Sequence, residues 1–587
     1  MAAPQASDAS IPSSDAGIPD KVCDIVMKGG ITSGVVYPLA LSSLAKEYRF
    51  SNIGGTSAGA IAAAAAAAAE YGRLTKGGGF ARLAGIPEDI GPRLLSLFQP
   101  TPGLKPLFDM FVAAMAAKSK LGRVCAVIGV AIARYFVSAI IGLLPGIAVI
   151  AIAARFGDYG LAAFGVLLAV VGLLIAILLR LWRAATADLP NNDFGLCPGL
   201  RQPYAASEAF TDWLARLIDE AAGRSPQTDP PLTFSDLAAP PGGRPAINLA
   251  MMTTSLMEKR PHVLPMEGHR FVFEKSEWAK LFPERIMAFL IKECEPYTPL
   301  AGETGEFYHF PDASRLPLVV AARLSLSFPV LITAVPLWCR DFTLLEETER
   351  SKLRRCLFSD GGLSSNFPIH FFDRLMPNSP TFAISLDEFD PKRNRSDVWL
   401  PSTAGSGSEL PIVPFAGMPG FLSRLIDSAK DWQDNLQSTL PGYRERIAHV
   451  VLKSDQGGLN VTMDKDTVTK LSGYGQQAAE LLRNKFDLDE HRWRRFLVAM
   501  ARMEETLDDV SDAYDGGTAG LEPFAHFLSR YAMHPAQFKQ KKPGVLAAML
   551  DRGKALADMG AAWRAKPTIR DGEIPRPATH LRIMAKQ

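Results

Sequence analysis

The chain has 587 residues, a net charge of only +2 at pH 7, and six scattered cysteines without a C-x-x-C pair. Its length exceeds one ordinary hydrophobic core, so we expect two or more domains. The balanced charge argues against nucleic-acid binding, and the cysteine spacing argues against a zinc or haem site. Hydrophobic residues make up 48% of the chain, which predicts a local apolar excess.

The chain begins with a polar stretch and continues with alternating strands and helices. Residues 1–20 are rich in Ala, Ser, Pro and Asp and lack the features of a secretory signal, so we expect a disordered tail. Residues 22–27 and 50–54 each have the pattern of a strand followed by a helix. This order predicts the opening of a three-layer α/β/α domain with a predominantly parallel sheet.

The second strand runs into a G-x-S-x-G sequence at residues 55–59, with Ser57 at its centre. In this motif glycines permit a sharp turn from strand to helix, and the serine hydroxyl stands clear of the sheet as a nucleophile. Alanines follow at residues 62–69, so the helix has little bulk and can pack closely on a sheet. The motif is short enough to occur by chance, so its meaning depends on its context.

The apolar excess lies in residues 121–183. Two uncharged runs, residues 135–154 and 161–179, each approach the roughly 20 residues that cross a bilayer. They predict an inserted transmembrane helical hairpin, in which Pro145 would kink the first helix or make it re-entrant. The alternative is a buried helical pair in a soluble core, and the lack of a polar face argues against it.

The charges around this hairpin predict its orientation. Basic residues stand before and after it, and in the joining loop Arg155 is offset by Asp158. By the positive-inside rule both outer ends lie in the cytoplasm, so we expect an integral membrane protein with its catalytic domain on the cytoplasmic side. The flanking basic residues are Lys118, Lys120, Arg123, Arg134, Arg180 and Arg183.

The α/β pattern resumes after a Pro/Gly-rich stretch and ends near Asp390. We therefore expect a catalytic domain at residues 21–390, a linker at 391–416 and a mostly helical region of unknown role at 417–587, with a basic tail after residue 566. The expected elements of the resumed pattern are strands at 246–253, 269–273, 356–359 and 381–386 and a helix at 316–327.

A serine nucleophile needs a base. Among the nine histidines, only His309 and His370 lie near other suggestive residues, and a packing or capping role is the simpler interpretation of His370. A carboxylate is offered by Asp360, which ends a short apolar strand and is followed by two glycines. The same three residues are also an ordinary turn signal.

Four motifs, in this order, resemble those of the patatin-like phospholipases. The resemblance spans residues 22–390 without the hairpin, and the chain is similar to bacterial-type members with such an insertion. The motifs are the turn with Gly29, Gly30 and Gly34, the elbow with Gly55, Ser57 and Gly59, the Ser-Phe-Pro segment at 321–329, and Asp360 with Gly361 and Gly362.

The resemblance implies a catalytic dyad without histidine, in which Ser57 is the nucleophile and Asp360 the base. It also implies an oxyanion hole made by the backbone N–H groups of Gly29, Gly30 and Ile31. An aspartate with a pKa near 4 is a weak base, so we expect a dry site that raises this pKa.

The first turn departs from the family pattern G-G-G-x-R-G. Ile31 stands in place of the third glycine, Ser33 in place of the arginine, and Lys28 where an aspartate is common. An isoleucine side chain leaves its own N–H available. The loss of the arginine leaves open what braces this turn.

Together these features predict a membrane-anchored serine lipid acyl hydrolase of phospholipase A or lysophospholipase type, acting through an acyl-enzyme on membrane lipids. No cofactor or metal is implied, since the sequence has no calcium-binding loop pattern. The expected partner is the lipid bilayer, through residues 121–183; a protein partner of the C-terminal region is not specified. The alternatives are a membrane scaffold or regulator with lost or secondary activity, and a thioesterase or transacylase.

Overall fold

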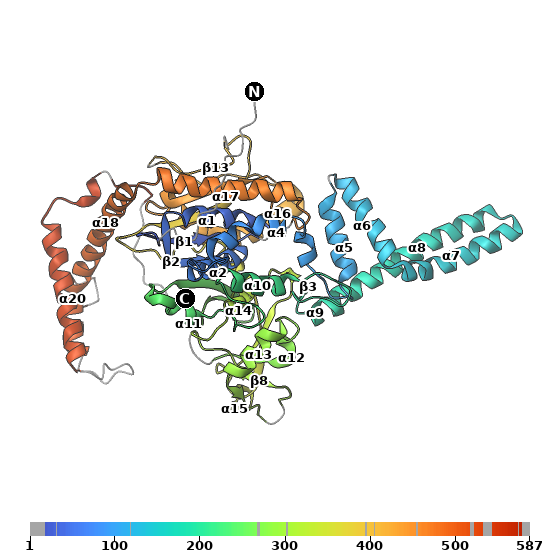
Figure 1. Ribbon diagram of the computed structural model, residues 1–587, viewed down its shortest axis with the longest axis horizontal. Coiled ribbons are helices and arrows are strands. Elements are labelled where there is room, and N and C mark those ends of the chain that lie inside the picture. Colours follow the sequence, from blue (N-terminus) through green and yellow to red (C-terminus); the bar gives the residue numbers. More distant parts are fainter. Residues whose placement is uncertain are drawn as a thin grey trace.

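The computed structural model describes residues 18–577 except 31, 118, 267–269, 301–302, 394–395, 404, 454–455, 459, 517–521, 532–542 and 573. Ile31, Lys118 and most of the expected N-terminal tail thus lie outside the described residues. The chain forms a mixed α/β body with a helical hairpin projecting from one end and long C-terminal helices at the other (Figure 1).

The strands are β1 (Lys21–Met27), β2 (Tyr48–Gly55), β3 (Gly195–Cys197), β4 (Asn248–Ser255), β5 (Arg260–Leu264), β6 (Val272–Glu274), β7 (Pro296–Tyr297), β8 (Phe307–His309), β9 (Val330–Ile332), β10 (Val335–Arg340), β11 (Leu353–Asp360), β12 (Thr381–Glu388), β13 (Val398–Trp399) and β14 (Ile447–Leu452). The helices of the first half are η1 (Ser33–Val36), α1 (Tyr37–Leu44), α2 (Ala58–Tyr71), α3 (Gly79–Ala84), α4 (Ile86–Ile90), η2 (Leu94–Leu97), α5 (Lys105–Ala116), α6 (Lys120–Arg134), α7 (Phe136–Phe156), α8 (Tyr159–Arg183), α9 (Leu189–Asn191), α10 (Phe210–Ala221), α11 (Phe234–Ala238), α12 (Lys275–Trp278) and α13 (Glu284–Glu293). The later helices are α14 (Leu318–Ser325), α15 (Glu347–Arg350), η5 (Gly361–Leu363), α16 (Gly417–Ser438), α17 (Lys465–Lys485), α18 (Leu488–Asp515), α19 (Phe524–Tyr531) and α20 (Pro543–Arg564).

One mixed sheet of twelve strands forms the centre of the body. Its order is β13-β14-β12-β1-β2-β4-β11-β10-β6-β8-β7, and β5 pairs with the other edge of β4. Neighbours from β14 to β4 run parallel, because helical crossovers connect these strands, whereas the rest of the sheet is antiparallel. The expectation of a predominantly parallel sheet therefore holds for five consecutive strands only.

The sheet also continues past the predicted end of the α/β pattern near Asp390. β14 pairs in parallel with β12, and β13 pairs with β14. α17 then packs on α1 and η1, where Gly475 lies so close to the Val36 carbonyl that no side chain would fit. The α/β body thus extends to about residue 485, and the mostly helical part follows it.

The alanine-rich helix α2 lies at the heart of this body. Residues 62–69 are all buried, and α2 contacts β2 and β4 on one side and α10 and α14 on the other. Small side chains allow this close approach on two sides at once. The prediction that this helix packs closely on the sheet is confirmed.

Helices α7 and α8 are long and apolar enough to cross a membrane by length and composition, with mean hydropathies of 2.5 and 3.0. They pack against each other through small residues, Gly142 against Gly172 and Gly146 against Ala169. A Cβ on Gly142 or on Gly172 would collide with the backbone of the other helix. α7 continues through Pro145 without ending. Most of their surface faces outward, unlike that of helices buried in a soluble core (Figure 1).

Candidate active site

The strand-to-helix turn at Ser57 has the sharp geometry expected of a nucleophile elbow. Ser57 has φ 56° and ψ −130°, a backbone conformation that costs free energy for any residue with a side chain. Glycines make the close crossing possible, since a Cβ at Gly59 would lie 2.3 Å from the Met27 carbonyl oxygen, and one at Gly55 would lie 2.2 Å from the carbonyl oxygen of Gly59.

The pairing register of β4 brings Asp360 to this turn. Gly55, near the end of β2, pairs with Met251, and Asp360, at the end of β11, pairs with Thr253 further along β4. Because β5 occupies the opposite edge of β4, β2 and β11 share one edge and their ends meet there. Two segments far apart in sequence thus converge at one point of the sheet.

Ser57 and Asp360 form a buried pair, 3% and 2% exposed. The Gly362 N–H donates a hydrogen bond of 2.7 Å to Asp360 Oδ1. Burial raises the pKa of Asp360 to about 7, although its interaction with the Ser57 hydroxyl acts in the opposite direction. Oδ2 has no partner within normal hydrogen-bond geometry, so the contact with Ser57 is loose. Loose pairing of this kind is common in catalytic sites before substrate binds.

The raised pKa predicts a specific pH dependence. Only the ionised carboxylate can accept the Ser57 proton, so we expect kcat/KM for a soluble ester to rise with pH through an inflection near pH 7. Initial rates between pH 5 and 9 would measure it. A flat profile, or an inflection near pH 4, would contradict the role of Asp360 as the base.

The glycine turn after β1 lies directly against Ser57. A Cβ at Gly29 would be 2.9 Å from Ser57 Cβ and 2.2 Å from Asn366 Oδ1. However, the Gly29 N–H already donates to the Asn366 carbonyl oxygen at 2.7 Å, so it is not available for the predicted oxyanion role. Gly29 instead provides space for the approach of Ser57. Of the other two predicted donors, Gly30 follows directly in this turn and Ile31 lies outside the described residues.

Contacts from distant parts of the chain brace this turn in place of the missing arginine. Lys28 lies 3.3 Å from Asp387, and the Tyr37 hydroxyl donates to the Lys28 carbonyl oxygen. Burial alone would raise the pKa of Asp387, but Lys28 and His449 together hold it far below its ordinary range. Thr32 donates its N–H to the Gly458 carbonyl oxygen at 3.0 Å. Residues beyond 440 therefore help to hold this glycine turn.

Asp434, on α16, is a site-supporting residue that the sequence analysis missed. This buried carboxylate accepts hydrogen bonds from Ser365 Oγ and from the backbone N–H groups of Asn366 and Phe367, at 2.6 to 2.8 Å. It thereby fixes the loop that receives the Gly29 N–H. No local sequence motif marks Asp434, because its three partners lie about 70 positions earlier in the chain.

The Ser-Phe-Pro segment also reaches Ser57. The Ser57 N–H donates to Ser325 Oγ at 3.3 Å, at the end of α14. Arg323, which is fully buried, donates to Ser327 Oγ and to the Thr333 carbonyl oxygen. The arginine thus holds the turn that follows α14 beside Ser57 and Asp360.

The two candidate histidine bases have other contacts. His370 packs its ring against Phe371, and His309 lies on β8 beside Tyr297. Within the described part of the chain, no group of three or more His, Cys, Asp or Glu side chains is placed to hold a metal ion.

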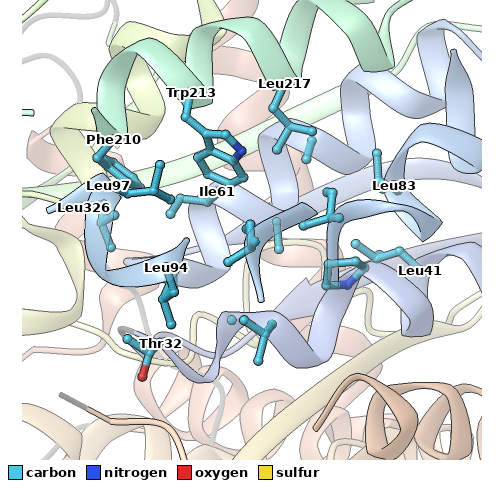
Figure 2. A pocket seen from close by; sticks show the side chains of 18 of the residues that line it. Thr32, Leu41, Ile61, Leu83, Leu94, Leu97, Phe210, Trp213, Leu217 and Leu326 are labelled. Carbon is cyan, nitrogen blue, oxygen red and sulfur yellow. The ribbon is translucent and has the colours of Figure 1, made fainter. Parts of the chain in front are cut away.

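An apolar cavity lies beside the turn at Ser57, between α1, α2, α10 and the segment from α3 to η2. Thr32, Gly34 and Ala58 form its end nearest Ser57. Figure 2 shows side chains such as Ile61, Trp213 and Leu217 pointing into it. The space open to the centre of a water molecule is about 80 Å³. It exists because the residues that α2 presents there are mostly alanines.

Comparison with known proteins places the chain in a family. No family model matches it. A protein named RpoH suppressor, from Rhizobium meliloti (strain 1021), is 33% identical over an alignment that covers 96% of the chain and 99% of that protein. The chain belongs to the family of this RpoH suppressor. The alignment with the RpoH suppressor extends over nearly the whole of both proteins, so the kinship is not confined to the α/β body.

Proposed function

We propose that the chain is a membrane-anchored serine lipid acyl hydrolase on a patatin-like α/β/α domain, of phospholipase A or lysophospholipase type. The observation that carries this proposal is the meeting of Ser57, on a strained strand-to-helix turn, with a buried Asp360 whose pKa is raised to about 7. Strain and a base tuned to neutral pH are both costly for the fold, and both serve nucleophilic catalysis.

The proposed reaction has two steps. Ser57 Oγ attacks the ester carbonyl carbon while Asp360 takes the hydroxyl proton, and the protonated Asp360 then returns that proton to the departing alcohol. In the second step Asp360 deprotonates a water molecule, which attacks the acyl-enzyme and releases the fatty acid and the Ser57 hydroxyl. The oxyanion of each intermediate would be stabilised by the N–H groups of Ala58, at the start of α2, and Gly30.

The cavity beside Ala58 supports a lipid as the substrate. Its walls are almost entirely apolar, and it begins at the residue after the nucleophile. A fatty acyl chain whose carbonyl carbon lies at Ser57 Oγ could extend into this space, where each buried methylene contributes about 0.8 kcal/mol. Such an arrangement favours long acyl esters over small polar ones.

We further propose that α7 and α8 anchor the enzyme in a membrane, with the catalytic domain on the cytoplasmic side. Their length, composition and outward-facing apolar surface support a spanning hairpin. Arg134, Arg180 and Arg183 at its base support this orientation. The anchor would hold the active site close to substrates that reside in the bilayer.

The proposed orientation predicts opposite labelling of two sites. We expect a cysteine at Tyr159, at the hairpin tip, to react with an impermeant maleimide in right-side-out vesicles, and one at Thr348, on α15, to react only after permeabilisation. Both variants would carry Cys125→Ser, since Cys125 is exposed and the other described cysteines are buried. The reverse labelling pattern, or labelling of both sites, would contradict the proposed topology.

A fluorophosphonate probe tests the enzymatic function. We expect the full-length protein to be labelled at Ser57, and the Ser57→Ala variant to lose that label. The loose Ser57–Asp360 contact and the occupied Gly29 N–H also suit the alternative of a scaffold with lost activity. A folded protein that the probe never labels would favour that alternative.

Release of free fatty acid from defined lipids, rather than transfer to a second alcohol or cleavage of a thioester, separates a hydrolase from a transacylase or thioesterase.

A further inference from the structure

Helix α16 buries a polar side chain and exposes apolar ones, which is the reverse of an ordinary surface helix. Its polar residue Asp434 is 4% exposed and points into the body, whereas Leu425, Ile426 and Trp432 are 56%, 63% and 62% exposed. A helix on a water-soluble domain normally buries its apolar side. The reversed arrangement indicates that an apolar environment outside the chain covers the outer face.

The exposed apolar surface extends along the whole helix and into the segment before it. Phe421 and Met418 continue the outer face one and two turns before Leu425, and Ile412 and Phe415 extend it beyond the start of the helix. We refer to the apolar side chains from residues 410 to 436 as the outer face of α16. This apolar surface is more extensive than the single, scattered apolar side chains that are normally exposed on soluble proteins.

The inner face of the same helix supports the candidate active site. Asp434 fixes the loop whose Asn366 accepts the Gly29 N–H. Lys430, one turn earlier, is close enough for its charge to act on Asp360. Whatever covers the outer face therefore lies next to the catalytic groups.

Three observations identify a lipid surface as the cover. The outer face combines aliphatic, Phe, Met and Trp side chains, which suit the interfacial layer of a bilayer. Basic side chains stand beside it: Lys392 is exposed, and Arg393, which pairs with Asp390, donates to the Ile412 carbonyl oxygen; the Lys392 charge suits anionic headgroups. Figure 1 also shows α16 at the end of the body from which α5 to α8 extend.

We propose that the outer face of α16 lies in the interfacial layer of the membrane and holds the mouth of the active site against the lipid. The inference rests on the proposed membrane-borne substrate. The hairpin would tether the chain, and α16 would set the distance and angle of the catalytic body. A phospholipid could then leave the bilayer beside Ser57 without crossing water.

Depth-dependent fluorescence quenching tests the docking independently of activity. The full chain in a Cys125→Ser background would carry an NBD label at Leu425→Cys, in nanodiscs of phosphatidylethanolamine and phosphatidylglycerol. We expect blue-shifted emission and strong quenching by doxyl-labelled lipid. The matched control, a label at Thr348→Cys on α15, should show neither. Water-like, unquenched emission at residue 425 would overturn the proposal. A blue-shifted NBD emission that appears in detergent only when the protein dimerises would also overturn it, because a second copy of the chain would then cover the outer face.

A second variant tests the consequence for turnover. We expect Ile426→Asp to lower hydrolysis of nanodisc phospholipid at least about ten-fold and to leave hydrolysis of soluble p-nitrophenyl butyrate unchanged, because the soluble ester need not leave a bilayer. Equal losses on both substrates would overturn the proposal. If the wild-type protein hydrolyses neither substrate, the proposed function fails, while the quenching result still decides whether α16 docks on lipid.

Discussion

Replacing Ser57 with alanine, or Asp360 with asparagine, is expected to lower kcat for ester hydrolysis by about 10⁴-fold or more, since nucleophile and base act as one unit. The double variant should be no worse than either single variant. Fatty acid release from a long-chain ester would measure the loss. Ser351→Ala and Asp229→Asn serve as controls, because Ser351 is half-buried and Asp229 exposed, and the side-chain contacts of both are local. Retained turnover in either site variant would remove that residue from the mechanism.

The same aspartate variant separates lost catalysis from lost folding. The pKa of Asp360 in the folded chain, about 7, is above the ordinary value of 3.8 that it has when unfolded. The folded state therefore binds the proton more tightly, and its stability falls as pH rises from about 4 to 7, by about 4 kcal/mol in total. We expect Asp360→Asn to raise the thermal unfolding midpoint at pH 8. A lower midpoint would mean that Asp360 stabilises the fold.

Filling the apolar cavity is expected to shorten the acyl chains that the proposed hydrolase accepts. Ala65 lines the cavity and is buried, so Ala65→Leu would occupy space that three or four methylenes would otherwise take. At about 0.8 kcal/mol per methylene, kcat/KM for a palmitoyl ester should fall about 100-fold. A butyryl ester, which does not reach that depth, should change less than about two-fold. The ratio of the two rates is the measurement.

A matched control for this change is available on α3. Ala81→Leu adds the same volume at an exposed position outside the cavity, so it should leave the chain-length ratio unchanged. Equal losses for both esters in Ala65→Leu would indicate strain at the elbow rather than a blocked acyl site, because overpacking beside α2 would disturb Ser57 itself.

Much of the local geometry of the site could be predicted from the sequence. The strand before Ser57, the glycines of its turn and the close-packed alanine helix depend on backbone preferences within about twenty residues, and each is present as expected. The strand that ends at Asp360 was also predicted, for the same reason. The uncharged runs in residues 121–183 likewise appear as two long helices.

Other features were decided only by the tertiary structure. The position of Asp360 beside Ser57 depends on the register of two strands along one edge of β4. The use of the Gly29 N–H by Asn366, and the support of that loop by Asp434, likewise depend on segments that meet only after folding. A backbone N–H in an isolated sequence has no defined partner. Long-range strand pairing and burial select that partner. They also set the pKa of Asp360, because this pKa depends on which distant parts of the chain exclude water from the site.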